Sequence, residues 1–110
     1  MAGTFIGDTI ADGQVAAAEA PIYTVPASTV AYVKQVAFYN TNALSQTLDL
    51  WIKKSGGTAR KLRRFVMDQH ESLDLLDSGE TLELSAGDAV EAATTTAGAV
   101  DFVVMGVEET

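Results

Sequence analysis

The sequence predicts an all-β protein: a single antiparallel β-sandwich of jelly-roll type with about eight strands. From residue 21 onward, short runs rich in β-branched and aromatic residues are separated by Gly, Pro, Asn or Asp. Several runs alternate apolar and polar side chains, which is the period of a half-buried strand. A length of 110 residues suits one domain with one core.

Two regions are expected, an extended N-terminal arm over residues 1–20 and the sandwich domain over residues 21–110. The arm is mostly small residues, and its large apolar side chains besides Met1 are Phe5, Ile6 and Ile10. Such a stretch is too thin to fill a core. It is interpreted either as a frayed end or as a short strand on a neighbouring subunit.

The first strands show the pattern most clearly. Residues 21–25 lie between two prolines, which suits a strand start or a sheet edge. In residues 29–39 the apolar phase changes at Lys34-Gln35, as a β-bulge would require. Residues 47–53 alternate, with Leu48, Leu50 and Ile52 on one face and Asp49, Trp51 and Lys53 on the other.

The second half continues with a strand over residues 59–67, a loop over 68–71 and one short helical turn as an option within 68–76. Residues 78–83 and 86–91 form a small repeat in which Gly and an acid enter a strand. Gly permits a positive φ there, and the acid can accept hydrogen bonds from nearby backbone amides. A tight turn at Ala97-Gly98 precedes the last strand, 99–107.

Charge is separated along the chain, whose formal net charge is −8. A basic segment, residues 53–64, holds six of the seven Lys and Arg residues and no acid: Lys53, Lys54, Arg60, Lys61, Arg63 and Arg64. From Phe65 onward there are eleven acids and no Lys or Arg. The acidic balance argues against nucleic-acid and anionic-membrane binding. The basic segment is interpreted as an interface, either within the chain or with another protein surface.

Catalytic and metal chemistry find little support. Cysteine is absent, and the single histidine, His70, lies in a polar loop without a recognisable Ser partner. A weak calcium site among Asp74, Asp77 and Glu80 is conceivable, but its spacing matches no EF-hand loop. No phosphate-binding or dinucleotide motif is present. We therefore predict no enzyme, no cofactor and no metal. A spanning helix and a signal peptide are not expected either.

Apolar side chains on outer strand faces suggest a contact surface. Trp51 lies opposite the apolar phase of its strand. If Val100, Phe102 and Val104 fill the core, Val103 and Met105 point outward. These three outward side chains are predicted at an intersubunit contact, the alternative being cover from the chain's own loops or arm.

The chain resembles small β-sandwich virion proteins of tailed bacteriophages from about residue 20 to its end. The resemblance is carried by turn-and-strand motifs at residues 23–34, 38–42, 78–83, 86–91 and 95–109. It implies a non-enzymatic capsid decoration (cement) protein, typically a homotrimer that binds the major capsid protein on the phage head surface. Two alternatives remain: a tail, baseplate or head–tail joining component, and a jelly-roll module that binds host glycans. The basic segment is not part of the resemblance.

Overall fold

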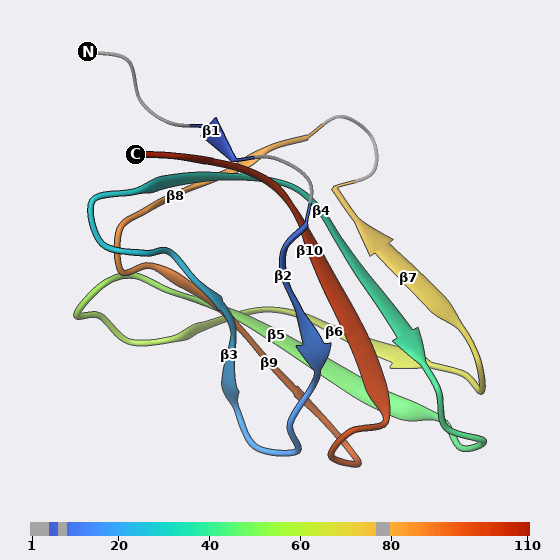
Figure 1. Ribbon diagram of the computed structural model, residues 1–110. Helices are drawn as coiled ribbons and strands as arrows, with labels where there is room; N and C mark the ends of the chain where they lie inside the picture. The colour runs from blue at the N-terminus through green and yellow to red at the C-terminus, as the bar shows by residue number, and fades with distance from the viewer. Residues whose placement is uncertain (1–4, 7–8, 77–79) are drawn as a thin grey trace.

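The computed structural model describes residues 5–6, 9–76 and 80–110, and in them the chain is all β, without a helix. Ten strands in this part of the chain form two antiparallel sheets that pack as a sandwich (Figure 1). The predicted fold class is confirmed. No helix in the described residues has the length and apolar character to cross a membrane.

The first sheet, called sheet one, contains β1 (Phe5–Ile6), β2 (Thr9–Gln14), β4 (Val30–Asn40), β7 (Ser72–Leu75), β8 (Leu82–Ser85) and β10 (Val100–Glu109). The second, called sheet two, has the order β3-β9-β5-β6, with β3 (Ala20–Thr24), β5 (Gln46–Lys53), β6 (Arg60–Met67) and β9 (Ala89–Thr94). Both sheets are therefore built from strands far apart in the sequence.

The strand order is that of a jelly roll. In sheet one β1 and β2 pair with different parts of β10, and β7 and β8 pair with different halves of β4. β1 and β2 together occupy one strand position in the sheet, and β7 and β8 together occupy another. Sheet one thus has four positions, as sheet two does. Consecutive positions along the chain alternate between the sheets from β2 to β5 and again from β6 to β10, while β5 and β6 are neighbours in sheet two. This is the two-sheet, eight-position plan expected from the sequence.

Part of the predicted N-terminal arm lies in the sandwich of its own chain. Residues 9–14 form β2, which pairs with Asp101–Met105 of β10. The next residue, Val15, is 1% exposed and belongs to the core, which the small-residue composition of this segment did not indicate. Pairing here covers an edge of β10 that would otherwise present free backbone groups. A further reach of the arm to a neighbouring subunit stays a prediction.

The bulge predicted in β4 is confirmed by the strand register. Met105 pairs with Gln35 while Gly106 pairs with Val33, so Lys34 is the extra residue of β4. Ala31 and Val33 before it, and Val36 and Phe38 after it, are all buried. The bulge allows both halves of this long strand to face the core.

Alternation also places the core side chains of the other long strands as expected. Leu48 and Leu50 of β5 are buried, and so are Val100, Phe102 and Val104 of β10. In both strands the intervening residues are only partly exposed. The core is therefore a single cluster between the sheets, to which both contribute.

The option of a helical turn within residues 68–76 is wrong, because Ser72–Leu75 form β7 against Val36–Tyr39 of β4. Its side chains alternate between exposed and partly buried, and Leu73 and Leu75 pack on the core. Residues 68–71 do form the expected loop. In this short segment the partner strand determines the conformation, since four residues carry too little pattern to distinguish a strand from a turn.

The second Gly-acid unit behaves as predicted. Gly87 has a φ of 85°, and Asp88 accepts hydrogen bonds from the backbone N–H groups of Ser55 (2.9 Å) and Ser85 (3.0 Å). Asp88 is 3% exposed and holds the β5–β6 turn against the β8–β9 turn. In the first unit Gly79 lies outside the described residues.

Candidate interaction surface

Four cations of the basic segment lie on β6, an edge strand of sheet two. Arg60, Lys61, Arg63 and Arg64 are all exposed, and β6 contains no acid. Within the described chain β6 pairs only with β5. Cationic side chains along an edge strand discourage pairing with another copy of the same edge. We call this strand with its four cations the basic edge.

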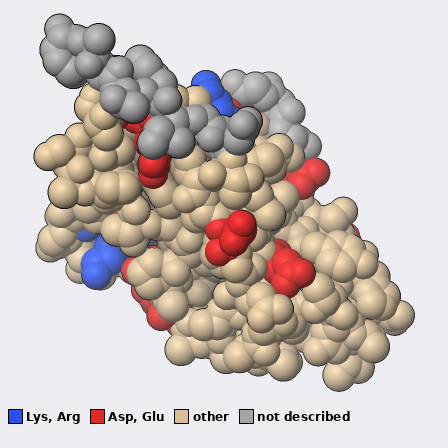
Figure 2. Space-filling view, viewed as in Figure 1, with Lys and Arg blue, Asp and Glu red and all other residues tan. Residues whose placement is uncertain are grey.

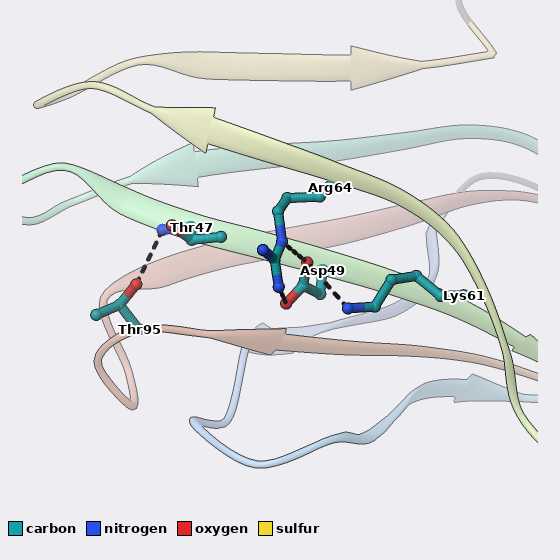
Figure 3. Close-up of polar contacts among 5 residues, drawn as sticks. All are labelled: Thr47, Asp49, Lys61, Arg64 and Thr95. Carbon is teal, nitrogen blue, oxygen red and sulfur yellow. Dashed lines mark hydrogen bonds and ion pairs between the residues drawn. The ribbon is translucent and has the colours of Figure 1, made fainter.

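Asp49 joins two of these cations on the outer face of sheet two. Arg64 donates to both carboxylate oxygens, with Nε 2.7 Å from Oδ1 and Nη2 3.2 Å from Oδ2 (Figure 3). Lys61 Nζ lies 3.6 Å from Oδ1. The hydrogen bond from Arg64 is the main reason that the pKa of Asp49 is lowered, and burial opposes it. One carboxylate is thus shared by two cations, so this cluster keeps an excess positive charge.

Two cations of the basic edge, one of them again Lys61, lie against aromatic rings. Lys61 Nζ is 5.1 Å from the centre of the Trp51 ring, and the Arg63 guanidinium carbon is 4.8 Å from the centre of the Phe65 ring. Each arrangement adds a cation–π attraction. Trp51 is consequently only partly exposed, between β6 and β9 on the outer face of its sheet.

The remaining members of the basic segment lie at its start. Lys54 donates a hydrogen bond to Asp88 at 3.0 Å and so helps to hold the β5–β6 turn in place. Lys53 ends β5, beside Ala89 of β9, and its charge acts to lower the pKa of Glu91. That pKa is nevertheless raised, first by a hydrogen bond with Glu19, then by burial and by the charge of Glu19.

Val103 and Met105 lie on the other sheet from Trp51, so the three predicted contact residues do not form one patch. Both are partly exposed on the outer face of sheet one. Val103 pairs with Asp12 on one side and with Ala37 on the other, and Ala37 pairs with Asp74. Paired residues share a face, so an acid lies at each end of this row.

Sheet one is accordingly an acidic layer. Its strands contain one basic residue, Lys34, at the bulge. In the view of Figure 2, acids are scattered over the face of the molecule and Lys and Arg appear only near its margins. The edge of this sheet formed by β7 and β8 carries exposed Asp74 and Glu83, with exposed Glu80 just before β8. We call these three acids and their strands the acidic edge.

A hollow of about 460 Å³ lies between the basic edge and the acidic edge. Its lining is largely aliphatic, with Leu62 from β6, Leu75 from β7 and Leu82 from β8, and Leu50 and Ile52 from β5. Arg63, Asp74 and Glu80 also border it. We call it the apolar hollow. A second, more polar hollow of about 310 Å³ lies beside Asp49 and Arg64.

Sequence reasoning missed the exposed apolar side chains of β6. Leu62 is 54% exposed and Val66 is 66% exposed, and both belong to the basic edge. Leu44 and Tyr39 are the other large exposed apolar residues in the described chain. Leu62 and Val66 could have been found from their position among cations. A strand with four exposed cations has few side chains on the core, so its apolar residues are also exposed.

No group of three or more His, Asp or Glu side chains converges as metal ligands in the described part of the chain. His70 lies in the loop before β7 with a φ of 56°, and its ring stacks on Tyr39 at 6.3 Å. Of the three residues weighed for calcium, Asp77 lies outside the described residues. The described residues of this surface offer charge and exposed apolar area.

No protein family and no curated protein matches the sequence. Solved structures do match. A chain from the disulfide-linked pili of Bacillus endospore appendages is 20% identical, with a TM-score of 0.51 over 98% of this chain and 89% of that one. A chain of infectious bursal disease virus strain Gx is 14% identical, with a TM-score of 0.46 over 97% of this chain and 32% of that one. The likeness to the pilus chain shows a shared fold.

Proposed function

We propose that this protein is a non-enzymatic structural subunit that assembles with copies of itself, and specifically a capsid decoration protein of a tailed bacteriophage. In this role it binds the major capsid protein on the outer surface of the head, as a homotrimer, and stabilises the shell. The resemblance of its turn-and-strand motifs to small phage virion proteins supports the specific assignment.

The observation that carries the proposal is one basic edge on an otherwise acidic jelly roll. Its four exposed cations share a single strand, and only two of them contact an acid of the described chain, Asp49. Separated charge of this kind orients a small protein on a surface of complementary charge. On a capsid lattice many such contacts act together, so a modest interface per copy suffices.

The pilus chain supports the broader part of the proposal, because a chain of the same fold forms pili. That assembly is described as disulfide-linked, whereas this sequence contains no cysteine. Contacts between copies of this chain therefore rest on charge, apolar burial and backbone hydrogen bonds.

Co-sedimentation with capsids tests the proposal. Purified chain is mixed with phage heads that lack it, and the pelleted fraction is measured at low and at high salt. The proposal expects saturable binding that weakens with salt, and heads that resist heat better when coated. The double variant Arg63→Glu, Arg64→Glu should bind less, and Thr58→Ser in the preceding turn serves as a matched control. Unchanged pelleting of the double variant would count against the role of the basic edge.

A further inference from the structure

The basic edge and the acidic edge lie on the same side of the sandwich. β6 is the last strand of sheet two, and the loop 68–71 leads directly from it to β7 on the edge of sheet one. Leu62 of β6 and Leu75 of β7 line the same hollow, so the two edges flank it. One side of the molecule thus presents two sheet edges of opposite charge with apolar surface between them.

Both edges have unused pairing capacity. In the described chain β6 pairs only with β5, while β7 and β8 pair only with β4. An edge strand with free backbone groups and exposed apolar side chains readily accepts another strand, unless charge or shape prevents it. Leu62 and Val66 supply exposed apolar area on β6.

Charge selects which edges can meet. Two basic edges repel each other, as do two acidic edges. A basic edge beside an acidic edge brings Arg60 and Arg63 near the acids of a second copy. Neither of these arginines forms an ion pair with an acid of the described chain, so both are available. The acidic edge offers Asp74, Glu80 and Glu83, which likewise form no ion pair among the described residues.

We propose that the basic edge of one copy docks against the acidic edge of a second copy and that this contact covers the apolar hollow. The two edges are different patches, and a contact that joins them heterologously repeats around an axis and closes a ring. Three copies would form the trimer of the proposed function, and the inference rests on that function only in taking the partner to be a second copy. Burial of the hollow supplies the apolar part of the stabilisation.

Cysteine cross-linking tests the contact without background, because the sequence contains no cysteine. Arg63→Cys places a thiol on the basic edge and Asp74→Cys places one on the acidic edge, in separately purified proteins. Mixed and oxidised, the two should give a dimer band on a non-reducing gel several-fold stronger than either protein alone. Thr24→Cys, exposed on β3 at the far edge of sheet two, is the control partner for Asp74→Cys. A control mixture that cross-links equally well would overturn the proposal.

Charge exchange provides the second test, with mass measured by light scattering. Wild type is expected at three times the 11.6 kDa of one chain. The variant Arg60→Glu, Arg63→Glu and the variant Asp74→Lys, Glu80→Lys should each lose the oligomer while keeping the wild-type circular dichroism. One chain carrying all four changes should regain it. A wild-type protein that stays monomeric, or a fourfold variant that does not recover, contradicts the proposed contact.

These outcomes are separable from those of the proposed function. A chain that cross-links edge to edge yet does not bind heads would contradict the decoration role and retain this contact. A chain that binds heads without the mixed cross-link would retain the role and contradict the contact.

Discussion

Asp49 and Arg64 lie directly opposite each other on β5 and β6, joined by two hydrogen bonds of 2.7 and 3.2 Å. The Asp49 side chain is 16% exposed and that of Arg64 is 62% exposed. The carboxylate is thus the inner partner of the pair, and it also faces Lys61. Loss of the acid and loss of the arginine should therefore have unequal effects.

We predict that Asp49→Asn lowers the melting temperature more than Arg64→Gln does. The first change leaves Lys61 and Arg64 side by side without their counter-charge, whereas the second leaves Asp49 with Lys61. The pKa of Asp49 is lowered in the folded protein, so its contribution is present above the unfolded pKa, about 3.9. It is lost as the pH falls toward the lowered value. Thermal melts at neutral and acidic pH check this, and equal effects of the two changes at neutral pH would contradict it.

Asp88→Ala should reduce the free energy of unfolding by about 1–3 kcal/mol, because it leaves two partly buried backbone donors without their acceptor. Asp88 accepts from two backbone N–H groups and from Lys54. Lys54→Ala removes only the exposed partner and should cost much less. Urea denaturation of both variants measures the difference. Similar midpoints for the two would show that the turn does not depend on the carboxylate.

Gly106→Ala should destabilise the sandwich by roughly 1–3 kcal/mol through steric overlap. A Cβ at this position would clash with the carbonyl oxygen of Tyr32 and lie 3.0 Å from Cα of Val33, opposite the β4 bulge. Gly56→Ala is the control, since no atom lies within 4 Å of its Cβ and only its φ of 72° is unfavourable. Its expected cost is about 1 kcal/mol. Denaturation midpoints rank the two, and a larger loss at Gly56 would contradict the close strand approach.

Glu91→Gln should raise the melting temperature at neutral pH and change it little in acid. The pKa of Glu91 is raised, first by its hydrogen bond with Glu19. A carboxyl whose pKa is raised by folding contributes stability that is fully present below its pKa in the unfolded state. That contribution is lost as the pH rises through its pKa in the folded state. The glutamine amide has the shape of the protonated carboxyl and does not ionise, so the variant avoids that loss. Melts across the acidic to neutral range check this. A variant less stable than wild type at neutral pH would show that the ionised form is favoured.

The sequence was most informative where long strands alternate. The phase change around Lys34 required a bulge, and the register confirms it because both halves of β4 face the core. The alternation of β5 placed Leu48 inside and Trp51 outside in the same way. In a long strand the alternation of apolar and polar residues alone shows which face is buried, so the neighbouring strand need not be known.

The conformation of short or weakly apolar segments could not be predicted, because it depends on the strand with which each segment pairs. β7 has four residues, and its conformation follows from pairing with β4. β2 is largely small and polar, yet it pairs along β10. The apolar hollow arises between strands of two sheets, so nothing local in the sequence marks it. The predicted strand 59–67 already held four of the six cations, but only the fold shows that this strand is the edge of its sheet.

The outward apolar residues show a second limit of the sequence pattern. Trp51, Val103 and Met105 were grouped by their outward phase, yet they lie on opposite sheets. An outward position in the alternation shows that a side chain points away from the core. It does not show which of the two sheets carries that side chain.

Immunogold labelling of intact phage particles with an antibody against this chain tests the central claim most directly. The account predicts label spread over the whole head. Label confined to the tail or to a single vertex would contradict the decoration role, and it would reassign the basic and acidic edges to the assembly of a ring at that position.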